Sequence, residues 1–566
     1  MKKFVYLLIV FIGVACGGVR STKYIAAPPS DPAPVPAPIE NCKTGQAVSF
    51  AEDILPLVQK SCFRCHPGYE TYATMVKNID EAIKRINLPF NDQKRMPLSP
   101  SPLLDIKEIQ LFENFKADGL QPSQACKDDL ASAVEQVKSL NDIETEILRD
   151  LNLLNVFQAN QARQLIVSHR FNAGASALSL LDHGAAINKA LNSLSSSNRI
   201  IPPTTIDKDK TIYRFFLNDY GLNASDWNNI LFVNKFDFVS NTQLGNQIKV
   251  ITGVDQPWLH ADNFINIALG KPEVYASLMR TPPTIDELNA FLEIDVYEEA
   301  ENFNLRYIGF NGSVISLQKN RLLVRAQNKD GDKYLWTTYD TNLDFVFNKN
   351  LFAFPLLYDF KEAEKIFNFD ASEVIYTLDN GLQGYALYGN DGNIAFEAPP
   401  DIVRNVESTF SPIIKVGMDC FLCHSKGLVP AVDMIRAHVE ANGSEFSAGD
   451  KTIIDAVYKN DITNKALFQA DIASYSIAAE KVGNGLEEDT INLFVDELRK
   501  DLNIVQVASF VFLSVDEFDA ELKRSAVLKA QIGQLLTGGT ITLVQFQESF
   551  PDIIIELRLG EDDVDK

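Results

Sequence analysis

The pentapeptide Cys62-Phe63-Arg64-Cys65-His66 recurs, with one substitution, as Cys420-Phe421-Leu422-Cys423-His424. Two cysteines spaced by two residues and followed directly by a histidine form the attachment sequence of a c-type haem. The chain has only seven cysteines and six histidines, so chance does not account for two such strings. The motifs predict two covalent haems, with the following attachment cysteines and proximal histidines: Cys62, Cys65 and His66; Cys420, Cys423 and His424.

A zinc site is the alternative use of these residues, with four cysteine ligands taken from the two motifs. Fused zinc ribbons usually place their cysteine pairs closer together than the pairs that begin at Cys62 and Cys420. The export signal described next also disfavours zinc, because it directs the chain to an oxidising compartment.

The N-terminus has the pattern of a secretory signal. Lys2 and Lys3 are followed by apolar residues 4–14, a run that is too short to span a membrane. Cys16 then resembles the acylated cysteine of a bacterial lipoprotein. We expect residues 1–16 to be a lipoprotein signal peptide that anchors the protein to the periplasmic side of the outer membrane. The alternative is ordinary signal cleavage, which would leave a soluble periplasmic protein.

The segment 17–41 is rich in proline and alanine, a composition that favours extended polyproline II structure and predicts a tether. No later segment has 18 consecutive apolar residues, so no further membrane span is expected. The net charge of −23 argues against a nucleic-acid partner, because no basic face is available to neutralise phosphates. An acidic surface is suited instead to a basic redox partner, or serves only solubility.

A first domain is expected over residues 42–126. Ser49 and Glu52 have the spacing of a capping box, which predicts a short helix running into Cys62. A second helix is expected from Leu103 to Gly119. Between them stands Met96, whose thioether is a suitable sixth ligand for haem iron.

This order of parts resembles the class I cytochrome c fold, and in particular the planctomycete-type cytochrome c domains. Leu98-Ser99 after the Met-Pro step and Glu108-Ile109 in the last helix are similar to the motifs of those domains, whereas Phe115 replaces a common tryptophan. The resemblance implies His66 and Met96 as the axial ligands of the first haem. Met75 is the alternative thioether.

Cys42 and Cys126 flank the first domain just outside its two terminal helices. Two remaining cysteines at opposite ends of one domain are expected to form a disulfide in an oxidising compartment. Closing a loop of this length would contribute on the order of 4 kcal/mol to stability. The alternative is a pair of free buried thiols.

The rest of the chain predicts an α+β middle domain over 127–400 and a helical haem-binding domain over 401–566, so the fold class is mainly α with a β-rich middle. Residues 127–199 are expected to be helical, and 211–217 alternate like a strand. Further short strands are expected between 306 and 396, separated by turns at three Asp-Gly or Asn-Gly steps: Asp330-Gly331, Asn380-Gly381 and Asp391-Gly392.

Residues 150–560 resemble a large, poorly characterised bacterial family that carries a C-terminal haem motif. Four stretches carry the resemblance: Asn192-Ser193-Leu194-Ser195, Ala261-Asp262-Asn263-Phe264, Asn320-Arg321-Leu322 and Asn380-Gly381-Leu382-Gln383-Gly384-Tyr385. The chain departs from the family at Val416-Gly417-Met418-Asp419, where relatives tend to read Asn-Gly-Ile-Ser. The resemblance implies ancestry but no particular reaction.

The sixth ligand of the second haem has three candidates. His438 and Met434 lie four residues apart on one expected helix, and His438 is the stronger donor. An open iron is the third possibility, and it would point to catalysis. His169, His183 and His260 are interpreted as packed or surface residues, because a lone histidine is more often structural than a ligand.

Electron transfer by a membrane-anchored periplasmic di-haem cytochrome is the function that the sequence favours, with a redox protein as partner. One alternative is a peroxidase-like di-haem enzyme with an open second iron. The other is a partner-binding module in which the second haem is structural.

Overall fold

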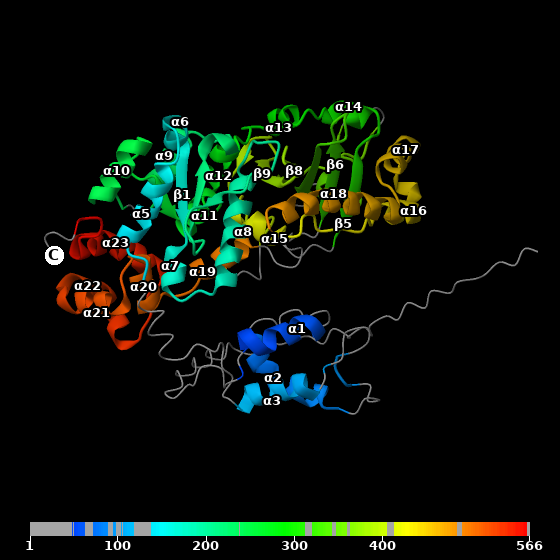
Figure 1. Cartoon of the computed structure of the whole chain (residues 1–566). Coiled ribbons are helices and arrows are strands. Elements are labelled where there is room, and N and C mark those ends of the chain that lie inside the picture. Colours follow the sequence, from blue (N-terminus) through cyan, green and yellow to red (C-terminus); the bar gives the residue numbers. More distant parts are fainter. Residues whose placement is uncertain are drawn as a thin grey trace, which may run out of the picture. The chain divides into compact units, whose positions relative to one another are not determined.

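The computed structural model describes residues 48, 50–62, 69, 72–88, 94–97, 104, 106–117, 137–236, 238–311, 320–341, 347–358, 363–404, 413–483 and 490–562. It divides the chain into two compact units, Met1–Ser132 and Ala133–Lys566 (Figure 1). The expected signal peptide and tether lie outside the described residues. So do five expected site residues: Cys16, Cys42, Cys65, His66 and Cys126.

The described part of the first unit has one π-helical turn and three helices: η1 Phe50–Ile54, α1 Leu55–Ser61, α2 Tyr72–Ile86 and α3 Ile106–Ala117. Their apolar faces meet in one core, in which Ile54, Met75 and Phe115 are almost fully buried. The helix predicted to run into Cys62 is confirmed, because α1 ends one residue before it. The second predicted helix is confirmed as α3.

The second unit opens with helices around a four-stranded sheet of order β2-β3-β1-β4. Its central strand β1 pairs antiparallel with β3 and parallel with β4. The strand predicted at 211–217 is confirmed as β3. The expectation of helix throughout 127–199 is wrong at β1, whose five residues are all buried and therefore show no alternation that sequence reading could detect. The strands are β1 Ala162–Ile166, β2 Thr204–Thr205, β3 Ile212–Phe216 and β4 Trp258–His260.

A six-stranded antiparallel sheet follows, in which consecutive strands are neighbours from β5 to β10. The strands are β5 Arg306–Phe310, β6 Arg321–Gln327, β7 Tyr334–Asp340, β8 Ala371–Thr377, β9 Gln383–Gly389 and β10 Ile394–Ala395. Three of its hairpins turn at the predicted glycines, Gly331, Gly381 and Gly392, each with a positive φ that disfavours other residues. The β-rich middle of the chain is therefore confirmed.

The helices before and between the strands are α5 Leu140–Leu151, α6 Val156–Gln161, α7 Ser168–Asn172, α8 Ala177–Ser193, α9 Ala224–Val233, α10 Gln243–Thr252, α11 Ala261–Ala268, α12 Pro272–Met279, α13 Ile285–Phe291 and α14 Val296–Glu301. After the second sheet come α15 Met418–Cys423, α16 Ile435–Ala441, α17 Ala448–Val457, α18 Asp461–Lys481, α19 Ile491–Leu498, α20 Ile504–Phe510, α21 Val515–Arg524, α22 Ala526–Ile532 and α23 Leu543–Leu557.

The helices after residue 413 pack into the same cores as the middle of the chain. Phe494 of α19 shares a buried cluster with Leu165 of β1, and Phe546 of α23 shares another with Ile143 of α5. The boundary expected between residues 400 and 401 is therefore not a division of the fold. A division was expected there because the composition changes from β-rich to helical, but the helices complete sheet-based cores that the strands cannot close alone.

The second sheet is covered on both faces. On one face Trp336 of β7 stacks on Phe468 of α18, with ring centroids 4.5 Å apart. On the other face α13, α14, α16 and α17 close a second core around β5 to β9 (Figure 1). The fold is mixed, with helices and two sheets, which agrees with the expected class. Among the described residues, no helix combines the length and apolar character of a membrane span.

Candidate haem centres

The second motif begins at a glycine that the packing requires. Gly417 precedes α15 with φ +96°, and a Cβ on it would lie 2.3 Å from the carbonyl oxygen of Leu269. The N–H of Met418 donates to that same oxygen at 2.7 Å. This contact joins the start of the motif helix to the end of α11.

The helix α15 carries both cysteines of the motif. Cys420 and Cys423 are three residues apart and therefore share a face of the helix. Both thiols are free; Cys420 is half-buried, and Cys423 is exposed. Burial raises the pKa of each thiol, so both thiols are protonated at neutral pH. Two unoxidised thiols on one helix face suit two thioether bonds to one porphyrin.

His424 follows the helix directly and has one ring nitrogen occupied. Its Nδ1 lies 3.1 Å from the carbonyl oxygen of Gly427, which can only accept, so Nδ1 carries the proton. Burial lowers the pKa of His424, against the opposing effect of that hydrogen bond. The imidazole is therefore neutral near pH 7, and its Nε2 keeps the lone pair that an iron ligand needs.

Aromatic rings pack against the motif from the sheet side. Phe421 is buried and meets Tyr385 of β9 edge-on, with centroids 5.0 Å apart, and Tyr275 of α12 at 6.2 Å. Tyr385 also stacks on His424, with centroids 6.0 Å apart and 27° between the planes. The backbone N–H of Tyr385 donates to the hydroxyl of Tyr275 at 3.2 Å. These contacts fix the position of the imidazole on the sheet.

A charged network lies on the same face of the sheet. Arg321 of β6 donates to both carboxylate oxygens of Asp340 on β7, at 2.9 and 2.7 Å, and to Glu373 of β8 at 2.6 Å. Asp340 is fully buried and Arg321 nearly so. Burial opposes the charge of Arg321, but the two carboxylates outweigh it and raise its pKa. The arginine therefore stays charged and holds both carboxylates in place.

The structure does not bring His438 or Met434 to His424. The N–H of Met434 donates to Gly309 on the edge strand β5, and Ile435 of α16 packs against the same glycine. Tyr385 lies on β9, and strands β8, β7 and β6 lie between β9 and β5. At about 4.8 Å for each inter-strand spacing, β9 and β5 are about 19 Å apart.

His438 also lies on the opposite face of the sheet. Its ring contacts Phe352 and Phe446, which belong to the core that α16 and α17 close, whereas Phe421 belongs to the other core. Sequence reading could not detect this, because the loop after the motif passes around the sheet edge before α16 begins. This placement does not support His438 as a ligand of the second haem.

In the first unit, three of the expected residues are described. Cys62 closes α1, is half-buried against the helical core, and has its pKa raised by burial to about 11. Met75 is fully buried among the core side chains of α2. Met96 is only half-buried, and its N–H donates to the carbonyl oxygen of Arg85 at the end of α2. Of the two thioethers, that of Met96 is therefore the more accessible as a candidate iron ligand.

The stretches 192–195 and 380–385 are linked directly. Asn380 of the hairpin before β9 donates to the carbonyl oxygen of Asn192 at 2.8 Å. A third stretch supplies Arg321 and the hairpin supplies Tyr385, so both reach the surroundings of the motif. Tyr385, Arg321 and Gly427 were not singled out as site residues from the sequence. The stretches 320–322 and 380–385, which were singled out from the sequence for another reason, contain the first two.

The remaining stretch carries Asp262, which lies in a buried cluster of ring and charge contacts. Asp262 binds Arg170 through one oxygen, and its other oxygen is 3.0 Å from Nε2 of His169. His260 stacks between Phe510 and Phe512, with centroid distances of 4.0 and 5.3 Å. Burial lowers the pKa of both histidines. They are neutral packing residues, as expected from the sequence for His169 and His260.

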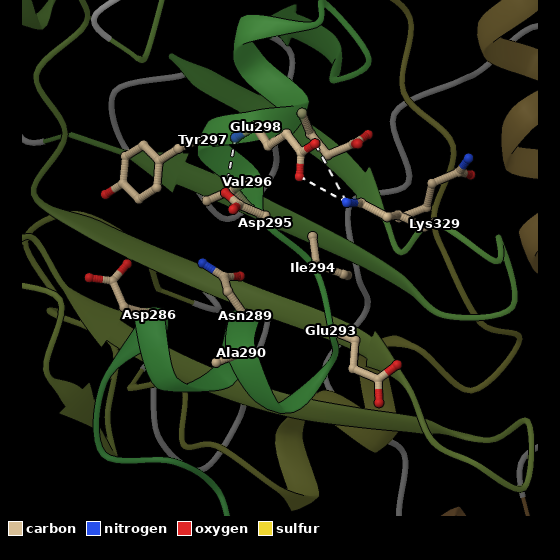
Figure 2. Close-up of a pocket in the computed structure, with 12 residues that line it drawn as sticks. Asp286, Asn289, Ala290, Glu293, Ile294, Asp295, Val296, Tyr297, Glu298 and Lys329 are labelled. Atoms are coloured by element: carbon tan, nitrogen blue, oxygen red, sulfur yellow. Dashed lines mark hydrogen bonds and ion pairs between the residues drawn. The ribbon is translucent and has the colours of Figure 1, made fainter.

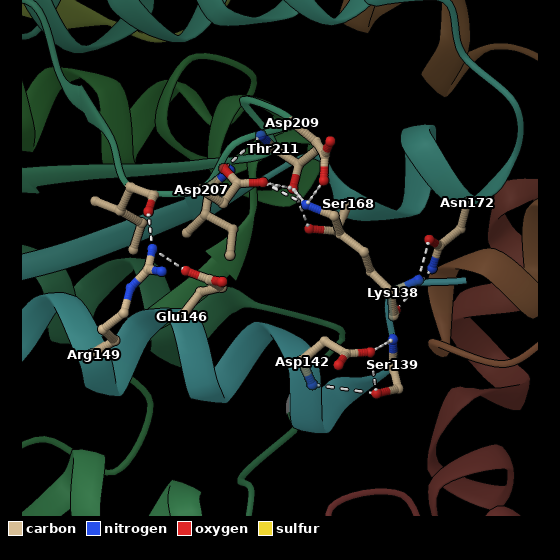
Figure 3. Close-up of polar contacts among 12 residues, drawn as sticks. Lys138, Ser139, Asp142, Glu146, Arg149, Ser168, Asn172, Asp207, Asp209 and Thr211 are labelled. Atoms are coloured by element: carbon tan, nitrogen blue, oxygen red, sulfur yellow. Dashed lines mark hydrogen bonds and ion pairs between the residues drawn. The ribbon is translucent and has the colours of Figure 1, made fainter. Parts of the chain in front are cut away.

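Two surface hollows of the second unit lie away from the motif. One, of about 490 Å³, is lined by α13, α14 and the end of β6, and Lys329 pairs there with Glu298 at 3.1 Å (Figure 2). The other, of about 350 Å³, lies beside α5, where the ammonium of Lys138 binds Asp207 and Asp209 (Figure 3). Neither hollow is lined by a residue of the second haem motif.

The second motif fits a covalently attached haem: two free thiols share one helix face, a neutral imidazole follows, and aromatic rings close the sheet side. Among the described residues, no group of three or more histidine, cysteine, aspartate and glutamate side chains is arranged to hold a metal ion by itself. Comparison with family models, curated proteins and solved structures found no match to this chain.

Proposed function

We propose that this chain is an exported electron-transfer protein that carries two covalent c-type haems. The observation that supports this most is the geometry at His424. Its Nδ1 is committed to Gly427, its pKa is lowered by burial, and it follows a helix with two free thiols. The two free thiols on the adjoining helix distinguish His424 from the buried structural histidines of the chain.

The chain's own residues have distinct roles in this proposal. Cys420 and Cys423 provide the thioether bonds, and His424 provides the proximal nitrogen. Phe421 and Tyr385 exclude water from the sheet side of the imidazole and keep its ring in one orientation. A bound haem supplies a one-electron couple at its iron. Because Cys423 is exposed, attachment takes place at the surface, where a partner protein can approach.

The proposed ligands of the first haem are His66 and Met96. The thioether of Met96 favours the reduced iron and raises the reduction potential. Met75 is excluded from this role in the proposal, because its side chain is fully buried between the helices of the first unit.

A peroxidase-like enzyme is the second candidate function. The positions of His438 and Met434 favour it. The sequence predicts these residues as candidates for the sixth ligand of the second haem, and in the fold both lie away from His424. If neither residue supplied a further ligand, a haem held by Cys420, Cys423 and His424 would be accessible to peroxide, whereas a further ligand from the chain would suit electron transfer alone.

Electron paramagnetic resonance of the oxidised protein separates the two functions. Two low-spin signals support the carrier. One high-spin signal, together with peroxide turnover by the wild-type protein, supports the enzyme. A haem assay and intact mass on protein produced with haem-maturation machinery test the common premise. Fewer than two haems per chain would contradict it.

We also propose that Cys16 carries lipid and holds the protein at the periplasmic side of the outer membrane. The acidic balance of the chain supports a basic redox partner and no nucleic acid. Fractionation of the wild type and of Cys16→Ser tests the anchor. The wild type is expected in the membrane fraction and the variant in the soluble periplasmic fraction, with both haems retained. A soluble wild type would refute the anchor.

A further inference from the structure

A carboxylate beside the second motif has no role in attaching or ligating haem. Glu373 of β8 pairs across the sheet with Leu387 of β9, two residues along from Tyr385. Ile375 lies opposite Tyr385, and Glu373 is two residues from Ile375 on the same strand, so Glu373 and Tyr385 lie on the same face of the sheet. Diagonal neighbours on one sheet face are about 7–8 Å apart. Since Tyr385 stacks on His424, Glu373 lies close to the motif.

The electrostatic contacts agree with this placement. Burial is the main cause of the raised pKa of Cys420 and Cys423, and the negative charge of Glu373 raises it further. Burial also lowers the pKa of His424, and the charge of Glu373 opposes that lowering. One carboxylate therefore acts on all three groups expected to hold the haem.

Glu373 is held rigidly. Arg321 donates to it at 2.6 Å and is itself fixed by the buried carboxylate of Asp340. The network has one cation and two carboxylates, so its net charge is −1. At His424 the charge of Arg321 opposes that of Glu373, but Glu373 has the larger influence on the pKa of His424. The side chain of Glu373 is 23% exposed, which leaves its charge only partly screened by water.

We propose that Glu373, fixed by Arg321 and Asp340, lowers the reduction potential of the second haem through its negative charge. This rests on the proposed function, because it requires a haem at Cys420 and Cys423. A negative charge near the iron stabilises the oxidised form, which carries one more positive charge than the reduced form. Glu373 touches no reacting atom in this proposal; its role is to set the potential.

The test is a redox titration of Glu373→Gln in the full chain. Cys62→Ser and Cys65→Ser are also introduced, so that only the second haem titrates. The potential is expected to rise in Glu373→Gln and to stay near the parent value in Glu373→Asp, which keeps the charge. The matched control is Glu298→Gln, which removes one carboxylate paired with Lys329 on the opposite face of the sheet and should not shift the potential.

An unchanged or lowered potential in Glu373→Gln, with haem content and fold intact, overturns the inference. If that variant does not fold, Thr338→Lys places an ammonium directly across the strand pair from Glu373 and should also raise the potential. An unchanged potential in a folded Thr338→Lys protein then overturns the inference. Absence of covalent haem at Cys420 and Cys423 in the parent refutes the proposed function instead.

Discussion

The imidazole of His424 lies against the ring of Tyr385, with centroids 6.0 Å apart and 27° between the planes. His424 is the last residue of the second motif and Tyr385 comes from the middle of β9, so the contact joins two segments that the sequence alone assigns to different domains. It makes the position of the proposed proximal ligand a property of the second sheet.

Truncation of this ring should therefore affect both stability and the second haem. Tyr385→Ala is expected to cost about 3 kcal/mol or more, because Tyr385 is 2% exposed and its removal leaves a cavity. Urea unfolding measures this cost, and the absorption spectrum of the second haem should change as the imidazole loses its support. Tyr385→Phe is the control, with a ring retained and a cost of about 1 kcal/mol. Equal effects of the two variants would show that packing of the Tyr385 ring does not cause the loss of stability or the spectral change.

Substitution of His438 should leave the second haem unchanged. The side chain lies on the opposite face of the sheet from His424, against Phe352 and Phe446. His438→Ala is expected to keep the spin state and potential of both haems, whereas His424→Ala should abolish the normal spectrum of one. Paramagnetic resonance of the two variants makes the comparison. A low-spin signal lost only in His438→Ala would restore His438 as the sixth ligand.

Met96 and Met75 should respond differently to removal. Met96→Ala is expected to lower the potential of one haem and to let its iron bind cyanide or carbon monoxide, because the thioether ligand is lost. Met75→Ala should instead cost about 2–5 kcal/mol in stability, since its side chain is fully buried in the helical core. Potentiometry with ligand-binding spectra, together with thermal unfolding, distinguishes them. Opening of the iron by Met75→Ala would reverse the assignment.

Removal of one pair of motif cysteines should remove one haem only. Cys420→Ser with Cys423→Ser is expected to halve the covalent haem measured by intact mass, because each pair serves one porphyrin. The reciprocal Cys62→Ser and Cys65→Ser protein should also keep one haem. Retention of both haems by either protein would contradict the assignment of attachment sites.

Stability of the second unit should fall on mild acidification. Burial lowers the pKa of His169 and His260 in the folded chain, whereas in the unfolded chain they titrate near 6.5. Below about pH 6.5 the unfolded state binds more protons, so their contribution is full above that pH and is lost as the pH falls below it. Each unit of pKa difference corresponds to about 1.4 kcal/mol. Urea unfolding at pH 7 and pH 5 measures the loss.

His260→Phe provides the matching test of this pH dependence. A phenyl ring can keep the stacking between Phe510 and Phe512 and cannot be protonated. The variant is expected to lose less stability between pH 7 and pH 5 than the wild type. An identical pH dependence would show that His260 does not contribute to it.

The local elements of this protein could largely be predicted from neighbouring residues in the sequence. The motif spacing identified both candidate haem sites. The short strands and glycine turns of the second sheet were predictable because β-propensity and hairpin turns depend on neighbouring residues. The helices that flank the first motif were predictable because apolar spacing and helix-end signals are also local. The buried strand β1 was missed, because a strand enclosed on both faces shows no period in its side chains.

Which of these elements meet depends on contacts between distant segments and is visible only in the folded chain. His438 and His424 are 14 residues apart in sequence, yet the chain passes around the edge strand β5 between them, so a sheet separates them. Glu373, Arg321 and Tyr385 come from three different strands and converge on the motif because strand pairing sets their register. Side-chain identity determines what a residue can bind, but its neighbours across a sheet depend on pairing between distant segments, which no local pattern encodes.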